Sequence, residues 1–86
     1  MPEICRFYGI VIKMYFGDHA PPHFHAEYAG SNAVFAIHSG AILGGKLPPR
    51  AMGLVAEWAE LRRDDLLSAW ERAEILSPIT KIEPLP

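Results

Sequence analysis

Apolar and β-branched side chains run almost without interruption through the first stretch of the chain, from Ile4 to Phe16. They occupy both parities, so a strand formed here has apolar residues on both faces and is covered on both sides. Gly9 interrupts the run, and a glycine inside a strand commonly marks a bulge or a bend. The pattern predicts one long, bent strand over residues 4–16 at the centre of a sheet.

The pattern changes to strict alternation after Pro22. Successive residues of a strand point to opposite faces, so residues 23–29 predict a strand with one polar and one apolar face. The polar face carries His23, His25 and Glu27, and the apolar face carries Phe24, Ala26 and Tyr28. The candidate functional side chains are therefore expected on one face of the strand and the core side chains on the other.

A turn signal, Gly30-Ser31, separates this strand from a second apolar run over residues 32–39. Two such runs joined by a glycine-containing dipeptide predict a β-hairpin. With a two-residue turn, the apolar residues of the two strands face one another and His23 faces His38. A slip by one residue would move the apolar residues to the histidine face, which disfavours it. The sequence thus predicts that these two histidines lie about 5.5 Å apart at Cβ.

The rest of the chain predicts an edge strand and two helices. A short apolar run, Ala41–Leu43, is closed by two glycines. From Pro49, which suits a first helical position, apolar residues recur with the helical period. The charged run Arg62–Asp65 interrupts that period, and the second helix is expected to end before Pro78. The predicted fold class is α+β: a small antiparallel β-meander of three to four strands followed by two C-terminal helices packed on one face, in the order ββββαα.

The length of 86 residues, 50% of them hydrophobic, fits a single globular domain. We expect a sheet part with the histidine-rich segment over residues 1–47, a helical part over 48–77, and an extended tail over 78–86 that straps across a neighbouring element. A chain this short buries only about 60% of its unfolded surface. Association into a homo-oligomer or with a protein partner is therefore expected.

Charge and cysteine content indicate which partners and which cellular location are expected. The net charge of −2 gives no general attraction to nucleic acid or anionic membranes, while local contact with RNA stays open. The single cysteine cannot form an internal disulfide and no signal-like segment is present, so a cytoplasmic location is expected. No apolar run approaches the roughly 20 residues that span a bilayer, so no membrane contact is expected.

The histidines are the clearest chemical feature of the sequence. Three of the four lie within seven residues, and the predicted hairpin brings the fourth beside them. Converging histidines are typical ligands of a divalent metal such as zinc. The candidate metal ligands are His19, His23, His25 and His38. Their spacing matches no established ligand signature, so a polar cluster without a ligand stays open as an alternative.

The same face supports a metal-free alternative. Histidine titrates near neutral pH, so His23 and His38, with His25 beside them, can serve as general base and acid in RNA cleavage. Arg50, Lys46 or Arg6 can stabilise the phosphate charge. The candidate catalytic residues are therefore His23, His25, His38 and Arg50. Residue types alone leave enzyme activity open.

Several separated motifs support a family resemblance. They are Pro2-Glu3-Ile4, Phe7-Tyr8-Gly9-Ile10, Met14-Tyr15, Asp18-His19, Pro22-His23-Phe24-His25, Gly45-Lys46-Leu47-Pro48-Pro49-Arg50, Glu57-Trp58 and Lys81-Ile82-Glu83-Pro84-Leu85-Pro86. In this order they resemble the bacterial domain-of-unknown-function family 4160 across essentially the whole chain. The resemblance implies a place in a two-gene cassette beside a protein of domain-of-unknown-function family 2442. It supplies no catalytic residues.

Such gene pairs are suspected toxin–antitoxin systems, so the resemblance implies a module of a toxin–antitoxin-like pair. An RNA-cleaving toxin that uses the face of His19, His23, His25 and His38 is one form of this expectation. The alternatives are a noncatalytic interaction or oligomerisation module and a histidine-ligated metal-binding protein.

Overall fold

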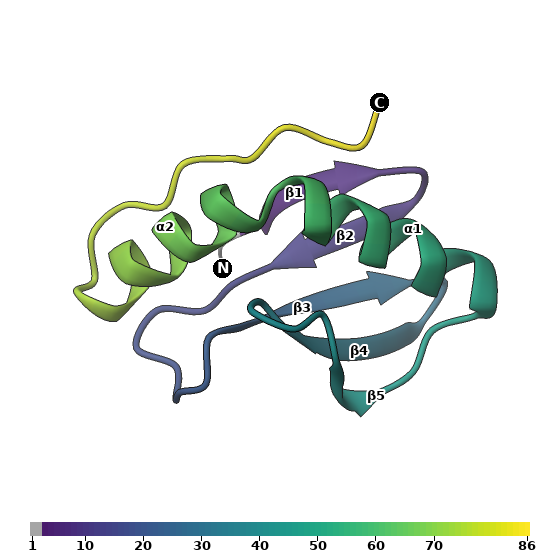
Figure 1. The fold of residues 1–86 in the computed structure, drawn as a ribbon, viewed down its shortest axis with the longest axis horizontal. Coiled ribbons are helices and arrows are strands. Elements are labelled where there is room, and N and C mark those ends of the chain that lie inside the picture. The colour runs from purple at the N-terminus through teal and green to yellow at the C-terminus, as the bar shows by residue number, and fades with distance from the viewer. Residues whose placement is uncertain (1–2) are drawn as a thin grey trace.

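The fold, described by a computed structural model for residues 3–86, is a five-stranded antiparallel sheet followed by two helices (Figure 1). The elements are β1 Glu3–Phe7, β2 Ile10–Lys13, β3 His23–Tyr28, β4 Ser31–Ala36, β5 Ile42–Gly45, α1 Pro49–Leu61 and α2 Arg63–Glu74. The strands lie in the sheet in chain order. The predicted α+β class is confirmed, with five strands where three to four were predicted. Residues 1–2 of the predicted sheet part lie outside the described residues.

The predicted long strand over residues 4–16 is wrong, because this stretch forms a hairpin of β1 and β2. Tyr8 and Gly9 are its turn, with φ of 51° and 81°. Consecutive left-handed residues are typical of the tight turns that suit the twist of a hairpin. Phe7 pairs with Ile10 across the turn, and Cys5 and Phe7 of β1 are buried together with Ile10 and Ile12 of β2. This explains why apolar residues occupy both parities, and it leaves β3 as the central strand.

The predicted register of the second hairpin is also wrong, by two residues. The turn is Ala29-Gly30, with φ of 49° and 82°, and not Gly30-Ser31. His23 therefore pairs with Ala36 instead of His38. Because the shift is an even number of residues, every side chain keeps its predicted face while its partner changes.

The two helices are separated at Arg62, within the predicted break. The second ends at Glu74, earlier than predicted, because Leu76 takes a left-handed φ of 58°. The Ser77 N–H then donates to the Arg72 carbonyl at 2.8 Å, which satisfies an end-of-helix acceptor in the Schellman pattern. Neither helix in residues 3–86 is long and apolar enough to cross a membrane.

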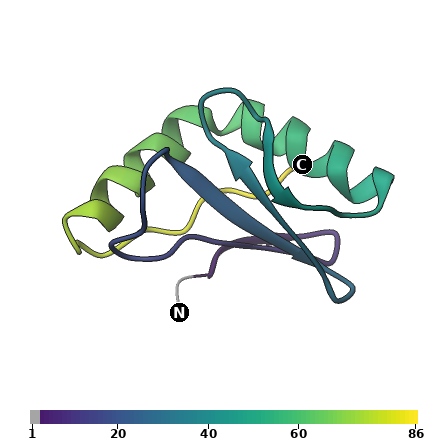
Figure 2. The same cartoon turned by 90° about the horizontal axis from the view of Figure 1, so that it is seen from below.

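The core lies between the sheet and the helices, which cover one face (Figure 2). Trp58 of α1 is fully buried, with its ring 5.4 Å from that of Phe7 and 5.7 Å from that of Phe24. Phe24 in turn stacks on Phe35 of β4 at 5.2 Å. Burying an aromatic or aliphatic side chain of this size contributes about 1.5–3 kcal/mol. The core thus fixes β3 from its apolar side.

The residues after α2 form an extended C-terminal strap, residues 77–86, that runs back beside β1 (Figure 1). The Ile82 N–H donates to the Ile4 carbonyl at 2.8 Å, and Trp58 Nε1 donates to the Glu83 carbonyl at 2.9 Å. Two apolar side chains of the strap, Ile82 and Leu85, are buried. The strap therefore covers the outer edge of β1 and closes one side of the core.

Candidate metal site

Three side chains with metal-binding atoms meet where the loop of residues 14–22 joins β3. Asp18 comes from the loop, and His23 and His25 come from the first half of the strand. One donor atom of each residue lies within 4.8 Å of the donors of the other two. Asp18 Oδ2 is 2.9 Å from His23 Nε2 and 3.6 Å from His25 Nε2. We call these three residues the Asp-His-His group.

Backbone contacts hold the loop in place beneath the group. The Gly17 N–H donates to the Ala73 carbonyl of α2 at 3.1 Å, which ties the loop to the end of the helix. One carboxylate oxygen of Asp18, Oδ1, accepts from the His19 N–H at 2.9 Å. The other oxygen, Oδ2, is therefore the one that faces the two imidazoles.

The ring of His23 is oriented by a backbone carbonyl. Its Nδ1 lies 2.7 Å from the Pro21 oxygen, which can only accept, so Nδ1 carries a proton and donates. Metal-binding histidines commonly donate their second ring nitrogen to such a carbonyl, which directs the other nitrogen to the metal. The ring is supported by Trp70 of α2 at a centroid distance of 5.0 Å. His23 Nε2 is thus positioned as a donor atom toward the group.

His25 contributes the least satisfied atom of the group. Its Nε2 is buried and has no hydrogen-bond partner among the described residues, although the side chain as a whole is 29% exposed. The ring is held edge-on by Tyr15 at a centroid distance of 4.8 Å. A buried polar atom without a partner costs about 1–3 kcal/mol. A cation seated among the three donors would supply the missing partner.

The carboxyl of Asp18 is kept in its ligand form by its neighbours. Burial acts to raise the pKa of Asp18, but the backbone N–H of His19 and the rings of His23 and His25 outweigh it and hold that pKa below the ordinary value. A metal ligand must be deprotonated. The Asp18 carboxylate therefore meets this condition at neutral pH.

The other candidate ligands lie outside the group. His19 is an exposed loop residue, and His38 is exposed in the turn that follows β4. The predicted pairing of His38 with His23 is wrong, because the hairpin register places Ala36 there. Of the four predicted metal ligands, His23 and His25 are the two that the fold brings together.

The predicted catalytic set is similarly divided. His23 and His25 are adjacent, with ring centroids 5.3 Å apart, whereas His38 and Arg50 are exposed at other positions. Arg50 lies in the first turn of α1. Glu27, on the histidine face of β3, is paired with Lys13 at 2.9 Å. The predicted base, acid and phosphate-stabilising residues do not form one constellation.

Asp18 is the member of the group that sequence reasoning left out of the ligand set. A usable signal existed, because Asp18 precedes the first histidine of the run directly. Periodicity placed the two strand residues on one face, but it gives no information on how a loop folds back onto that face. The supporting rings of Tyr15 and Trp70 were likewise not identified in advance.

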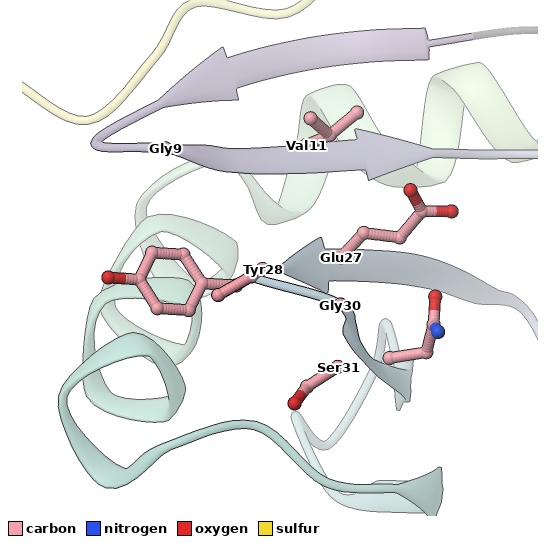
Figure 3. A pocket seen from close by; sticks show the side chains of 8 residues that line it. Gly9, Val11, Glu27, Tyr28, Gly30 and Ser31 are labelled. Carbon is pink, nitrogen blue, oxygen red and sulfur yellow. The ribbon is translucent and has the colours of Figure 1, made fainter.

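The opposite end of β3 carries a surface hollow of about 190 Å³ (Figure 3). It lies between the turns of the two hairpins, with Gly9 and Val11 on one side and Tyr28 and Ser31 on the other. No histidine lines it, and its one carboxylate, Glu27, is the residue paired with Lys13. The hollow is therefore separate from the Asp-His-His group.

The fold and the site together define a small α+β domain whose central strand carries a candidate metal site. This chain belongs to the family described as Domain of unknown function (DUF4160), whose family model matches residues 9–71. The matched span contains the whole Asp-His-His group and most of both helices, and it confirms the resemblance noted in the sequence. No curated protein and no solved structure is significantly similar to the chain.

Proposed function

We propose that this protein is a metal-binding protein that holds a divalent transition metal ion through Asp18, His23 and His25. The observation that carries the proposal is the convergence of three donor atoms, one of which is a buried imidazole nitrogen with no hydrogen-bond partner among the described residues. The Pro21 carbonyl behind His23 accepts from Nδ1, a contact that metal-binding histidines usually make with the ring nitrogen that does not bind the metal. Two imidazoles and one carboxylate are a donor set typical of zinc and of iron(II).

The distances support this donor set. Two ligands of a tetrahedral zinc ion with bonds of about 2.0–2.1 Å lie about 3.3 Å from each other. The two distances from the Asp18 carboxylate to the imidazoles, 2.9 Å and 3.6 Å, lie on either side of that value. The Asp18 carboxylate is therefore within a few tenths of an ångström of a ligand's separation from each imidazole, and the two imidazole donors lie within 4.8 Å of each other.

Metal titration of the tag-free protein tests the proposal. After removal of adventitious metal with a chelator, calorimetry with zinc or cobalt should give one ion per chain. Asp18→Asn, His23→Ala and His25→Ala should each weaken binding by at least about 100-fold, since losing a ligand costs more than the 10–100-fold of a lost supporting contact.

His38→Ala is the matched control, because it removes an exposed histidine outside the group. Its metal affinity should stay within about twofold of that of the parent chain, a smaller change than the 10–100-fold expected when a hydrogen-bond partner of a ligand is lost. Absence of stoichiometric binding, or an equal loss in the control, would contradict the proposal.

For the cellular role, we propose the one that the family resemblance implies: one component of a toxin–antitoxin-like pair with the neighbouring protein of family 2442. Induced expression in a bacterial host, with and without that neighbour, tests it. We expect growth arrest that the neighbour relieves, that a His23→Ala, His25→Ala double variant abolishes, and that His38→Ala retains. RNA is then the first substrate to test. Normal growth in every arm would favour a noncatalytic interaction module instead.

A further inference from the structure

We propose that an ion held by the Asp-His-His group keeps a coordination position open for an anionic ligand from solution, such as a carboxylate or phosphate oxygen. This inference rests on the proposed metal-binding function. It concerns the type of site: closed sites with four protein ligands are structural, whereas sites with three protein ligands admit water or substrate.

The number of donors is the first argument. Among residues 3–86, the histidines, cysteine and carboxylates that could hold an ion form a single group of three. The chain's cysteine, Cys5, is buried in the core. His19 and His38 are exposed outside the group, and Glu27 is engaged by Lys13. A four-coordinate ion is therefore one ligand short, and a six-coordinate ion is three short.

Charge is the second argument. The group contributes one carboxylate and two imidazoles, and the imidazoles bind metal in their neutral form. A divalent cation in this set keeps one net positive charge, and a bound ion is the largest local charge in its site. The only other carboxylate on this face of β3, Glu27, already has a cationic partner. An incoming anion is thus favoured over a neutral or cationic ligand.

Access is the third argument. The helices cover the opposite face of the sheet from His25, whose neighbours Phe24 and Ala26 are the residues buried in the core (Figure 2). The side chains of Asp18 and His25 are 26% and 29% exposed. The carboxylate that completes the group is on a loop and not within the packed layers. Helix α2 borders the group at His23, whose ring packs against Trp70. A small ligand can therefore approach the ion from the side of Asp18 and His25, whose side chains are partly exposed.

Cobalt-loaded full-length protein provides the test, because the visible absorption of cobalt(II) reports its ligands. Azide, acetate and phosphate are titrated separately, with perchlorate as the control for ionic strength. We expect azide to change the cobalt spectrum in a saturable manner with one azide per ion, and acetate or phosphate to compete with it. A cobalt spectrum that none of the three anions changes would overturn the inference and leave the metal-binding function intact.

Two outcomes separate this inference from the function on which it rests. Failure to take up cobalt at all would overturn both. Azide could leave the cobalt spectrum of the parent chain unchanged but change that of a His19→Ala or a His38→Ala variant. The histidine replaced in that variant would then occupy the fourth coordination position. That result would overturn the open position and identify the fourth ligand.

Discussion

The two faces of strand β3 differ in whether the chain itself supplies contact partners for their side chains. On the inner face, Phe24 and Ala26 are fully buried and packed by residues of the chain itself. On the outer face, His25 carries a buried nitrogen for which the described residues supply no hydrogen-bond partner. Alternate residues of one strand thus contribute to the packed core and to the proposed metal site. Substitutions on the inner face should change stability, and substitutions on the outer face should change metal binding.

The largest expected effect is on the inner face. Phe24→Ala should lower the free energy of unfolding by about 3–5 kcal/mol, because it removes a buried ring and leaves a cavity between Phe35 and Trp58. Urea denaturation measures the loss. Phe24→Leu should show the same direction with a smaller loss, which keeps the test informative if the alanine variant fails to fold.

Val11→Ala, at a half-buried position on the outer face, is the comparison for that substitution. It should cost clearly less than Phe24→Ala, since less apolar surface is returned to water. Equal losses at the two positions would contradict the division between the faces.

The next effect is stabilisation by metal on the outer face. Zinc at about 100 times its dissociation constant should raise the free energy of unfolding by about 2.7 kcal/mol, because it binds the folded chain alone. Thermal unfolding with and without zinc measures this, and a chelator should reverse it. His25→Leu should remove the response, and a response that persists in this variant would place the ion elsewhere.

A smaller effect is expected from His25→Leu in the absence of metal. Removing the unpartnered buried nitrogen should leave the metal-free protein as stable as the parent or more stable by about 1 kcal/mol. The same substitution would then stabilise the metal-free chain and abolish metal binding. A loss of more than about 1 kcal/mol on urea unfolding would show that His25 is needed for packing instead.

The smallest effect is expected at the ion pair of Lys13 and Glu27, also on the outer face. The hydrogen bond to Glu27 raises the pKa of Lys13 above its ordinary value of 10.5. A raised pKa in the folded state contributes stability that is complete below the unfolded pKa and is lost as pH rises through the folded pKa. Lys13→Met should therefore change the free energy of unfolding little at pH 7. Above pH 10.5, the free energy of unfolding of the variant should fall less steeply with pH than that of the parent chain.

Unfolding at neutral and alkaline pH compares this variant with Lys46→Met, which alters an exposed lysine outside the strands. The Lys46 variant should follow the pH dependence of the parent chain. If both variants flatten the alkaline decline to the same extent, the ion pair is not its cause.

The division between the two faces was predictable from sequence, whereas the partners across the strands were not. Alternation after Pro22 assigned each side chain of β3 to its face, and burial confirms it. The first hairpin turn was interpreted as a bend within one strand and the second was misplaced by one residue, for one reason. Each begins with a left-handed residue other than glycine, Tyr8 or Ala29, directly before the glycine. A glycine signals a turn, but it does not say which of its neighbours shares the left-handed conformation.

The candidate site was predictable to the same extent. His23 and His25 share a face because of strand geometry, so their proximity followed from the sequence. The predicted pairing of His38 with His23 failed with the register. Asp18 joins the group through a loop whose path depends on the bond from Gly17 to the end of α2. Contacts of that kind between distant segments leave no periodic signal in a sequence.

The C-terminal strap has a consequence for how the protein is made. Tyr8 in the first hairpin donates a hydrogen bond to the carbonyl of Pro86, which follows it by 78 residues. At about 5–20 residues per second, a ribosome needs roughly 4–16 s to synthesise that interval. During this time β1 exists without the segment that covers its edge, so a nascent chain presents an open strand to chaperones and to other chains. Strand β1 is therefore synthesised well before the segment that protects its edge.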